Sequence, residues 1–166
     1  RHIDWKVFAR TDKLFTRQYE EETNLKCLLV IDGSSSMFYP QPGNGKINFS
    51  VKAAAALGWL LNRQRDAVGV TIFDELILSS TPVTSTRVGL DKLFTTLQQF
   101  ISGDSLARRS SGRDSRRGTE TAEILHEIAE KVHRRSLIIL FTDMFDDSGD
   151  PDEIFKALQH LRHNKH

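Results

Sequence analysis

Two short apolar segments, each ending in an aspartate, constrain the fold of this chain most strongly. Residues 25–31 lead into Asp32, and residues 136–142 lead into Asp143. Both segments have the composition of buried strands, and amphipathic helical patterns lie between them and after the second one. Because strands alternate with helices, the sequence predicts an α/β fold with a mainly parallel, doubly wound sheet and helices on both faces.

The sequence between the two segments supplies further elements. A helix is predicted over residues 46–65, and its apolar side is expected to hold Ala53, Ala56, Leu57, Leu60 and Leu61. Residues 67–73 predict a strand, Asp74-Glu75 a two-residue turn, and residues 76–80 a return strand. This hairpin adds one antiparallel edge strand to the predicted sheet.

Helical patterns account for most of the remaining chain. Thr86 is expected to cap the amino end of the next helix. The apolar face of that helix is formed by Leu90, Leu93, Phe94, Leu97 and Ile101. Residues 120–134 predict another helix, and Pro151 after Asp150 predicts the start of the last one. Residues 102–118 break the periodicity, with five arginines concentrated within 106–117.

Composition limits the functional classes. The chain has 166 residues, a formal net charge of +1 and one cysteine, Cys27. A chain of this length suits one soluble domain, and its charge gives no drive toward nucleic acid or membrane surfaces. A single cysteine cannot form an internal disulfide, which favours a reduced, cytoplasmic setting. No apolar run approaches the roughly 18 residues of a membrane-spanning helix.

The two ends of the sequence indicate a fragment of a longer protein. The chain opens on Arg1 without a methionine and closes at His166 inside a helical pattern. We therefore expect a charged amino-terminal extension over residues 1–24 and a truncated domain over residues 25–166. Membrane attachment through segments outside this sequence stays open.

The first strand is followed by a pattern that suits a metal ion. Asp32, Ser34 and Ser36 place one carboxylate and two hydroxyl groups at every second position. Oxygen ligands of this kind suit a hard cation such as Mg²⁺, with Mn²⁺ and Ca²⁺ as alternatives. Sites in open α/β sheets lie beyond the carboxyl ends of the strands, which is where this pattern falls.

This D-x-S-x-S pattern resembles the metal-ion-dependent adhesion site of von Willebrand factor A (vWA) domains. Those domains take a threonine from a G-T-x-T loop and an aspartate from the end of a later strand, as in Gly118-Thr119-Glu120-Thr121 and at Asp143. The resemblance implies a Rossmann-like sheet in which the strands ending at Asp32 and Asp143 are neighbours. It also implies that the last strands of a complete vWA sheet are absent from this sequence. The metal site it implies is formed by Asp32, Ser34, Ser36, Thr119 and Asp143.

The start of the chain adds a more specific resemblance. It is similar to a bacterial family of unknown function, number fifty-eight in the DUF series, through Arg1-His2-Ile3-Asp4-Trp5-Lys6, Ala9-Arg10 and Tyr19-Glu20-Glu21-Glu22-Thr23. That family joins such a segment to a vWA-like domain, usually encoded beside a MoxR-type AAA+ ATPase. The resemblance implies a protein partner of that kind, and a role in chaperone-like assembly.

The sequence thus predicts a non-enzymatic interaction module. Its metal would keep an open position for an acidic side chain of a partner protein, and no nucleic acid is expected to bind. The alternative is a metal-dependent phosphohydrolase with Asp32 as nucleophile, although related phosphotransferases carry a second aspartate where Ser34 stands. A nucleotide-binding loop is disfavoured, because Gly43-Asn44-Gly45-Lys46 lacks the upstream glycine and Lys46 is followed by Ile47.

Six histidines remain outside this site. His126 and His133 lie seven residues apart in one predicted helix, and a solvated face is favoured there over a second metal site. His160, His163 and His166 are spaced by three near the end of the chain. A surface helix is favoured for these as well, over weak binding of a transition metal.

Overall fold

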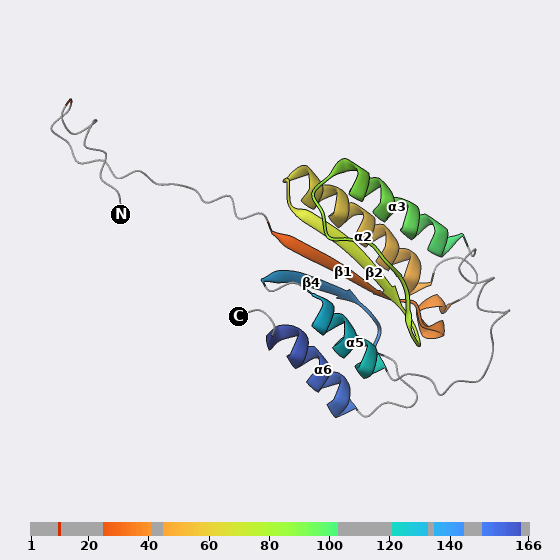
Figure 1. The fold of residues 1–166 in the computed structure, drawn as a ribbon. Helices are drawn as coiled ribbons and strands as arrows, with labels where there is room; N and C mark the ends of the chain where they lie inside the picture. The colour runs from red at the N-terminus through yellow and green to blue at the C-terminus, as the bar shows by residue number, and fades with distance from the viewer. Residues whose placement is uncertain are drawn as a thin grey trace.

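The structure, a computed structural model, describes residues 10, 25–40, 45–102, 121–132, 135–144 and 151–163. Helices and strands alternate along these segments (Figure 1). The elements are β1 (Lys26–Asp32), the 3₁₀ helix η1 (Ser35–Phe38), α2 (Lys46–Arg63), β2 (Ala67–Phe73), β3 (Ile77–Ser80), α3 (Arg87–Ile101), α5 (Thr121–Lys131), β4 (Ser136–Phe141) and α6 (Pro151–His163).

The described strands form one four-stranded sheet in the order β3-β2-β1-β4. The central strand β1 pairs in parallel with both β2 and β4, whereas β3 pairs antiparallel with β2. The predicted α/β fold is therefore confirmed, including the mainly parallel sheet and its antiparallel edge strand. The strand order changes direction at β1, so that β1 and β4 are neighbours although about a hundred residues separate them.

Helices cover the sheet on both faces, with α2 and α3 on one side and α5 and α6 on the other (Figure 1). The side chains of β1 alternate between the two layers. Cys27, Leu29 and Ile31 pack on the α2/α3 side, while Leu28 and Val30 pack on the α5/α6 side. Because successive side chains of a strand point to opposite faces, a strand that is buried on both faces is apolar at every position.

The apolar side predicted for the helix over 46–65 is confirmed at Leu57 and Leu61, which contact the core, and wrong at two other positions. Ala56 is exposed and Leu60 is 45% exposed. The buried positions are Ile47, Ser50, Val51, Ala54, Gly58 and Leu61. A Cβ atom on Gly58 would lie 3.4 Å from a methyl group of Leu93, so α3 packs directly over this glycine. Close packing at Gly58 thus turns the helix away from the face that residue hydrophobicity alone suggested.

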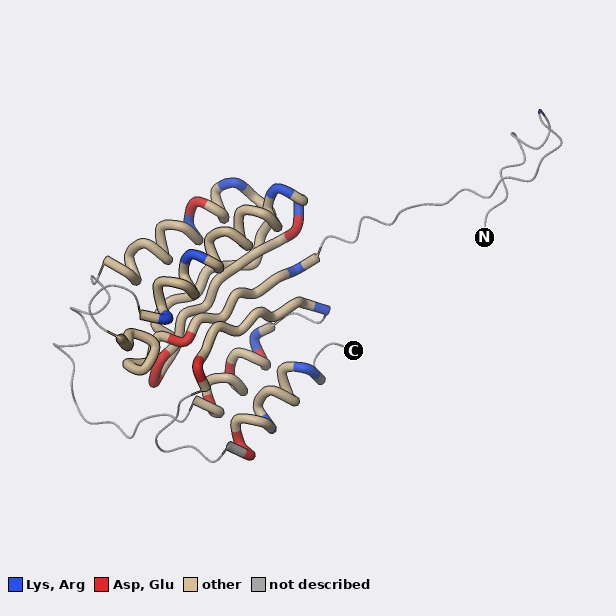
Figure 2. Tube along the Cα trace, turned by 180° about the vertical axis from the view of Figure 1, so that it is seen from behind, with Lys and Arg blue, Asp and Glu red and all other residues tan. Residues whose placement is uncertain are grey.

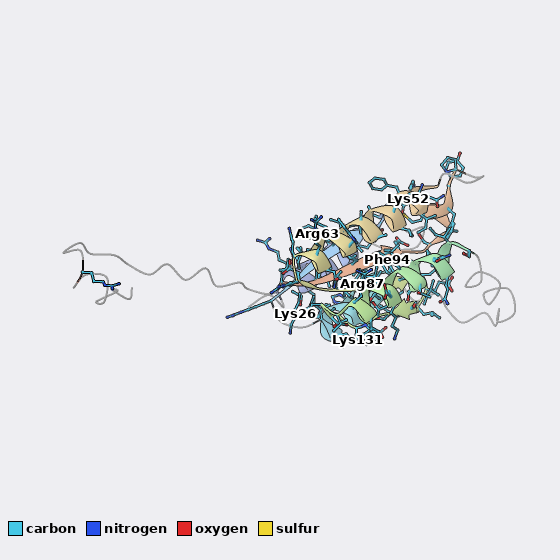
Figure 3. All side chains as sticks on the ribbon, turned by 90° about the horizontal axis from the view of Figure 1, so that it is seen from above. Lys26, Lys52, Arg63, Arg87, Phe94 and Lys131 are labelled. Carbon is cyan, nitrogen blue, oxygen red and sulfur yellow. The ribbon has the colours of Figure 1, made fainter. Side chains whose placement is uncertain are left out.

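The outer side of α2 carries its polar and aromatic residues. Lys52 and Arg63 are exposed there (Figure 3). The guanidinium group of Arg63 lies 5.3 Å from the ring centroid of Trp59. A cation over an aromatic face in this way shields part of the indole from water.

Two smaller predictions need correction and one is confirmed. The return strand begins at Ile77, since Leu76 is 60% exposed and belongs to a three-residue turn in which the Asp74 N–H donates to the Leu76 carbonyl. Ile101 is 43% exposed, and Phe100 takes its place in the core. The hydroxyl of Thr86 accepts a hydrogen bond from the Gly89 N–H, which confirms the predicted cap.

Several predictions lie outside the described residues. These are the structure of the extension over 1–24 apart from Arg10, the arginine-rich segment within 106–117, and the positions of Thr119 and His133. Within the described residues, no helix is long and apolar enough to cross a membrane.

Candidate metal centre

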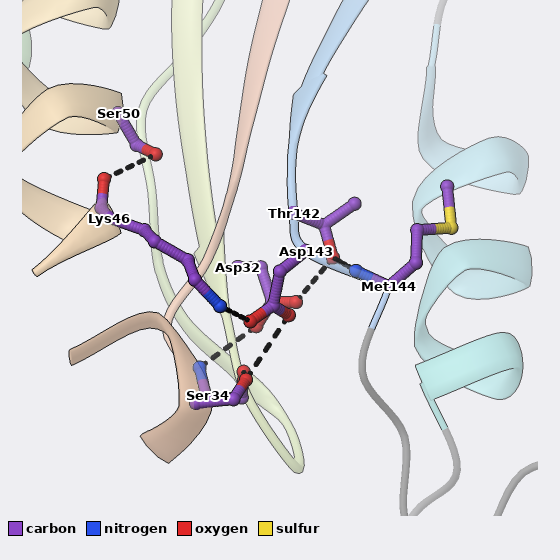
Figure 4. A network of polar contacts seen from close by, with 8 residues as sticks. Asp32, Ser34, Lys46, Ser50, Thr142, Asp143 and Met144 are labelled. Carbon is purple, nitrogen blue, oxygen red and sulfur yellow. Dashed lines mark hydrogen bonds and ion pairs between the residues drawn. The ribbon is translucent and has the colours of Figure 1, made fainter. Parts of the chain in front are cut away.

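The carboxyl ends of β1 and β4 bring the two predicted aspartates together. Ile31 of β1 lies opposite Phe141 of β4 in the parallel register. Asp32 therefore follows at the level of Thr142, and Asp143 lies one residue further on. Figure 2 shows acidic positions where the strands end, and Figure 4 shows the contacts between them.

Asp32 is buried, with 4% of its surface exposed, and neutral donors hold both of its carboxylate oxygens. Oδ1 accepts a hydrogen bond of 2.8 Å from the backbone N–H of Ser34. Oδ2 accepts one of 2.6 Å from the hydroxyl of Thr142. Because a buried carboxylate is costly without partners, these two bonds fix both the side chain and the loop that follows it.

Thr142 belongs to this site, and the sequence analysis missed it. Its hydroxyl donates to Asp32 and accepts from the Met144 N–H at 3.0 Å. Residues that lie opposite each other in a parallel pair point to the same face. Residues 32 and 142 therefore share the face that packs against α5 and α6. This pairing depends on the register between β1 and β4, and the sequence alone does not specify that register.

Asp143 has a different set of partners. Its Oδ1 accepts a 3.2 Å hydrogen bond from the Ser36 hydroxyl, and its Oδ2 lies 2.7 Å from the Nζ of Lys46. Its side chain is 11% exposed, while that of Lys46 is 51% exposed. The half-exposed ammonium group therefore closes the solvent side of an otherwise enclosed carboxylate.

The two serine hydroxyls connect the aspartates. Their oxygens lie 3.1 Å apart. Since the Ser36 hydroxyl donates its proton to Asp143, the Ser34 hydroxyl is the donor in this second contact. Four of the five predicted site residues thus form one connected network, namely Asp32, Ser34, Ser36 and Asp143. The fifth, Thr119, lies outside the described residues.

Tight packing holds the serine loop against the sheet. The Gly33 N–H donates to the Phe73 carbonyl at 2.6 Å, and a Cβ atom at this glycine would come within 2.9 Å of the Phe100 ring. Met37 is buried in the core, and the ring of Phe38 lies 6.0 Å from that of Phe100. Side chains on both sides of the loop are therefore anchored, which leaves the hydroxyls of Ser34 and Ser36 at the ends of β1 and β4.

Lys46 is the second residue that the sequence analysis did not assign to the site. It is the first residue of α2, and Gly45 before it packs so closely that a Cβ atom would lie 2.8 Å from the Phe38 carbonyl oxygen. This contact between the start of α2 and the end of η1 brings Lys46 near Asp143. The sequence analysis considered Lys46 only as the lysine of an incomplete nucleotide-binding loop.

A cavity beside Asp32 extends the site toward α5. It is lined by Thr121 and Met144 as well as by Asp32 and Thr142. Thr121 is the second threonine of the G-T-x-T segment and the first residue of α5. The amino end of α5 therefore faces the same side of the site as Asp32.

The oxygen set suits a hard divalent cation. Two carboxylates and two hydroxyls lie in one hydrogen-bonded network, and a cation, the Lys46 ammonium, already lies 2.7 Å from one carboxylate. Mg²⁺ prefers such oxygen ligands and usually keeps several waters. Among the described residues, no three of the His, Cys, Asp and Glu side chains form a group that could hold a metal. A metal here would therefore depend on the serine hydroxyls.

Cys27 takes no part in this chemistry. It is fully buried within β1, and burial followed by the nearby charge of Asp66 raises the pKa of its thiol to about 11. The thiolate is the nucleophilic form, so this cysteine stays inert at neutral pH.

Sequence comparison identifies the family of the chain. A family described as "Protein of unknown function DUF58" matches residues 1–165. The chain belongs to the DUF58 family. No curated protein shows significant sequence similarity to it. The match covers the amino-terminal segment and the strand-loop motif together, so it confirms the family that the sequence motifs indicated.

Proposed function

We propose that this DUF58 chain is a non-enzymatic protein-interaction module with a divalent cation site. Ser34, Ser36 and Thr119 contact the ion, and the carboxylates of Asp32 and Asp143 bind it directly or through water. The observation that carries the proposal is the path of contacts from Lys46 through Asp143 and Ser36 to Ser34. These contacts support a cation site, because oxygen atoms gather beside a carboxylate that already pairs with a positive charge. Mg²⁺ is the proposed ion, with Mn²⁺ and Ca²⁺ as alternatives.

In this proposal, the ion takes over the role of the Lys46 ammonium. A divalent cation near Asp143 repels the lysine, whose half-exposed side chain can turn into solvent. Serine and threonine ligands are neutral, so the cation keeps residual positive charge. A coordination position open to solvent then accepts an acidic side chain of a partner protein.

The contacts of Asp32 favour binding over catalysis. A nucleophilic carboxylate needs an oxygen that can approach the substrate. Both oxygens of Asp32 instead accept hydrogen bonds, and the residue is 4% exposed. Two residues on, where related phosphotransferases carry an acid, the chain has Ser34. We therefore place the metal-dependent phosphohydrolase second.

The partner and the setting are proposed from resemblance and composition. A MoxR-type AAA+ ATPase is the proposed partner, in chaperone-like assembly, because DUF58 proteins are usually encoded beside such ATPases. A cytoplasmic location is proposed because the one cysteine is a buried free thiol.

Two measurements on the same preparation separate the functions. We expect the full-length protein to retain a MoxR-type ATPase from its own genome in Mg²⁺ and to lose it in EDTA or as Asp143→Asn. We also expect no turnover of generic phosphoesters in Mg²⁺ or Mn²⁺. Retention that is equal in Mg²⁺, in EDTA and for the variant would remove the metal-bridged model. Turnover abolished by Asp32→Asn would establish the phosphohydrolase instead.

A further inference from the structure

A pair of histidines joins α5 and α6, the two helices on the face of the sheet opposite α2 and α3. His126 lies in α5 and His160 in α6, and their Nδ1 atoms are 2.9 Å apart. The ring centroids are 5.1 Å apart and the rings are inclined by 42°. Both side chains are half-buried. The sequence analysis expected both histidines on solvated helix faces and missed the pair, because 34 residues separate the two along the chain.

Small residues explain why the two helices come this close. Ala129 of α5 and Ala157 of α6 are fully buried, and each lies three residues from one of the histidines. Residues three apart lie on the same side of a helix. The alanines let the helices approach, and the histidines then meet one turn away. Figure 1 shows α5 and α6 side by side along this contact.

The geometry of the two nitrogens selects a class of ion. With metal–nitrogen bonds of about 2.0–2.1 Å, two ligands at 90° lie about 2.9 Å apart, whereas ligands at a tetrahedral angle lie about 3.3 Å apart. The hydrogen bond between the rings already holds the two Nδ1 atoms 2.9 Å apart, so an ion that takes ligands at a right angle can bind them without a change in that separation. Right-angle coordination by nitrogen is typical of the tetragonal sites of Cu²⁺ and Ni²⁺.

We propose that His126 and His160 form a second metal site, which takes Cu²⁺ or Ni²⁺ between their Nδ1 atoms. In the metal-free protein one Nδ1–H donates to the other Nδ1. When the ion binds, the donating ring changes tautomer: its Nδ1 gives up a proton and its Nε2 takes one up from water, so both neutral rings offer an Nδ1 lone pair to the ion. Since no third His, Cys, Asp or Glu joins the pair among the described residues, water completes the coordination. This site is independent of the Asp32 centre.

The test is a titration of the purified protein with Ni²⁺ and Cu²⁺. In saturating Mg²⁺, which fills the proposed Asp32 centre, we expect one site for Ni²⁺ or for Cu²⁺, and a rise of about 5–10 °C in the unfolding midpoint at a metal concentration near a hundred times the dissociation constant. Paramagnetic resonance of the Cu²⁺ form should show two equivalent nitrogen ligands. His126→Gln and His160→Gln should each weaken binding at least tenfold.

Matched variants separate this pair from the other histidines. The double variant His163→Gln/His166→Gln and the single variant His133→Gln should bind as wild type does. Loss of binding in the 163/166 variant with retention in His126→Gln would assign the ion to the end of the chain and overturn the proposal. A Cu²⁺ spectrum with fewer than two nitrogens in the wild-type protein would overturn it as well, whether or not the variants fold.

Discussion

Asp32 and Asp143 end neighbouring parallel strands, yet their surroundings differ in kind. Asp32 is 4% exposed and accepts hydrogen bonds from a backbone N–H and a hydroxyl. Asp143 accepts a hydrogen bond from the Ser36 hydroxyl and forms an ion pair with Lys46, whose side chain is half-exposed. Neutral groups of the fold hold Asp32, whereas Asp143 also pairs with the Lys46 ammonium, whose half-exposed side chain can turn into solvent.

The alternation of side chains along β4 accounts for this difference. Ile138 and Leu140 pack on the α5/α6 side, and Thr142 continues that series toward Asp32. Ile139 and Phe141 pack on the α2/α3 side, and Asp143 continues that series toward Lys46 at the start of α2. Neighbouring residues of β4 thus face opposite sides of the sheet: Thr142 holds the carboxylate of Asp32, whereas the carboxylate of Asp143 pairs with a lysine. We infer that Asp32 organises the site and that Asp143 controls its affinity for cations.

The largest effect should come from removing Asp32. Asp32→Ala leaves the Ser34 N–H and the Thr142 hydroxyl without their acceptor in a buried place. We expect a loss of about 2–4 kcal/mol in the free energy of unfolding, because each unsatisfied buried group costs about 1–3 kcal/mol. Urea denaturation measures this loss. A change below that of Asp143→Asn would contradict the structural role of Asp32.

Asp143→Asn should separate binding from stability. Its ion pair involves a half-exposed lysine, and such pairs contribute only about 0–1 kcal/mol. We therefore expect stability within about 1 kcal/mol of wild type, together with a loss of roughly a hundredfold in Mn²⁺ affinity, or about 2.7 kcal/mol. Calorimetric titration and urea denaturation of one preparation give both values. A large loss of stability would place Asp143 in the same class as Asp32.

Thr142→Val tests whether the hydrogen bond from Thr142 orients Asp32 for cation binding. The substitution keeps the shape of the side chain and removes the hydroxyl that donates to Asp32. We expect a cost of about 1.5–3 kcal/mol in unfolding free energy, as for a hydrogen bond to a charged group. Mn²⁺ affinity should fall by about tenfold, as is typical when a partner of a metal ligand is lost. Unchanged affinity would show that Asp32 needs no help from Thr142.

Lys46→Gln should have the smallest effect, and in the opposite direction. Without the ammonium group, a divalent cation no longer displaces an ion pair worth up to about 1 kcal/mol. We expect Mn²⁺ to bind roughly two- to fivefold more tightly. Lys52→Gln is the matched control, because Lys52 is an exposed lysine of the same helix. Equal affinities for the two variants would remove Lys46 from the account.

The sequence predicted the strands and their neighbours better than it predicted contacts. The two apolar runs predicted the strands that end at Asp32 and Asp143, because buried strands leave a strong local pattern. That these strands are neighbours was implied by the resemblance to vWA domains. The contacts of Thr142 and Lys46 were missed, since they depend on strand register and on how closely Gly45 packs against η1. The histidine pair depends on the approach of two helices at Ala129 and Ala157. No local pattern reports such an approach.

The most direct test of the central claim compares two neighbouring serines. Ser36 donates to Asp143, whereas Ser35 is exposed in the same turn. We predict that Mn²⁺ at about a hundred times its dissociation constant stabilises the wild-type protein and Ser35→Ala by about 2.7 kcal/mol, and that Ser36→Ala loses most of this gain at the same concentration. Equal stabilisation of the two serine variants, or none in the wild type, would contradict a cation site built on the hydroxyls between Asp32 and Asp143.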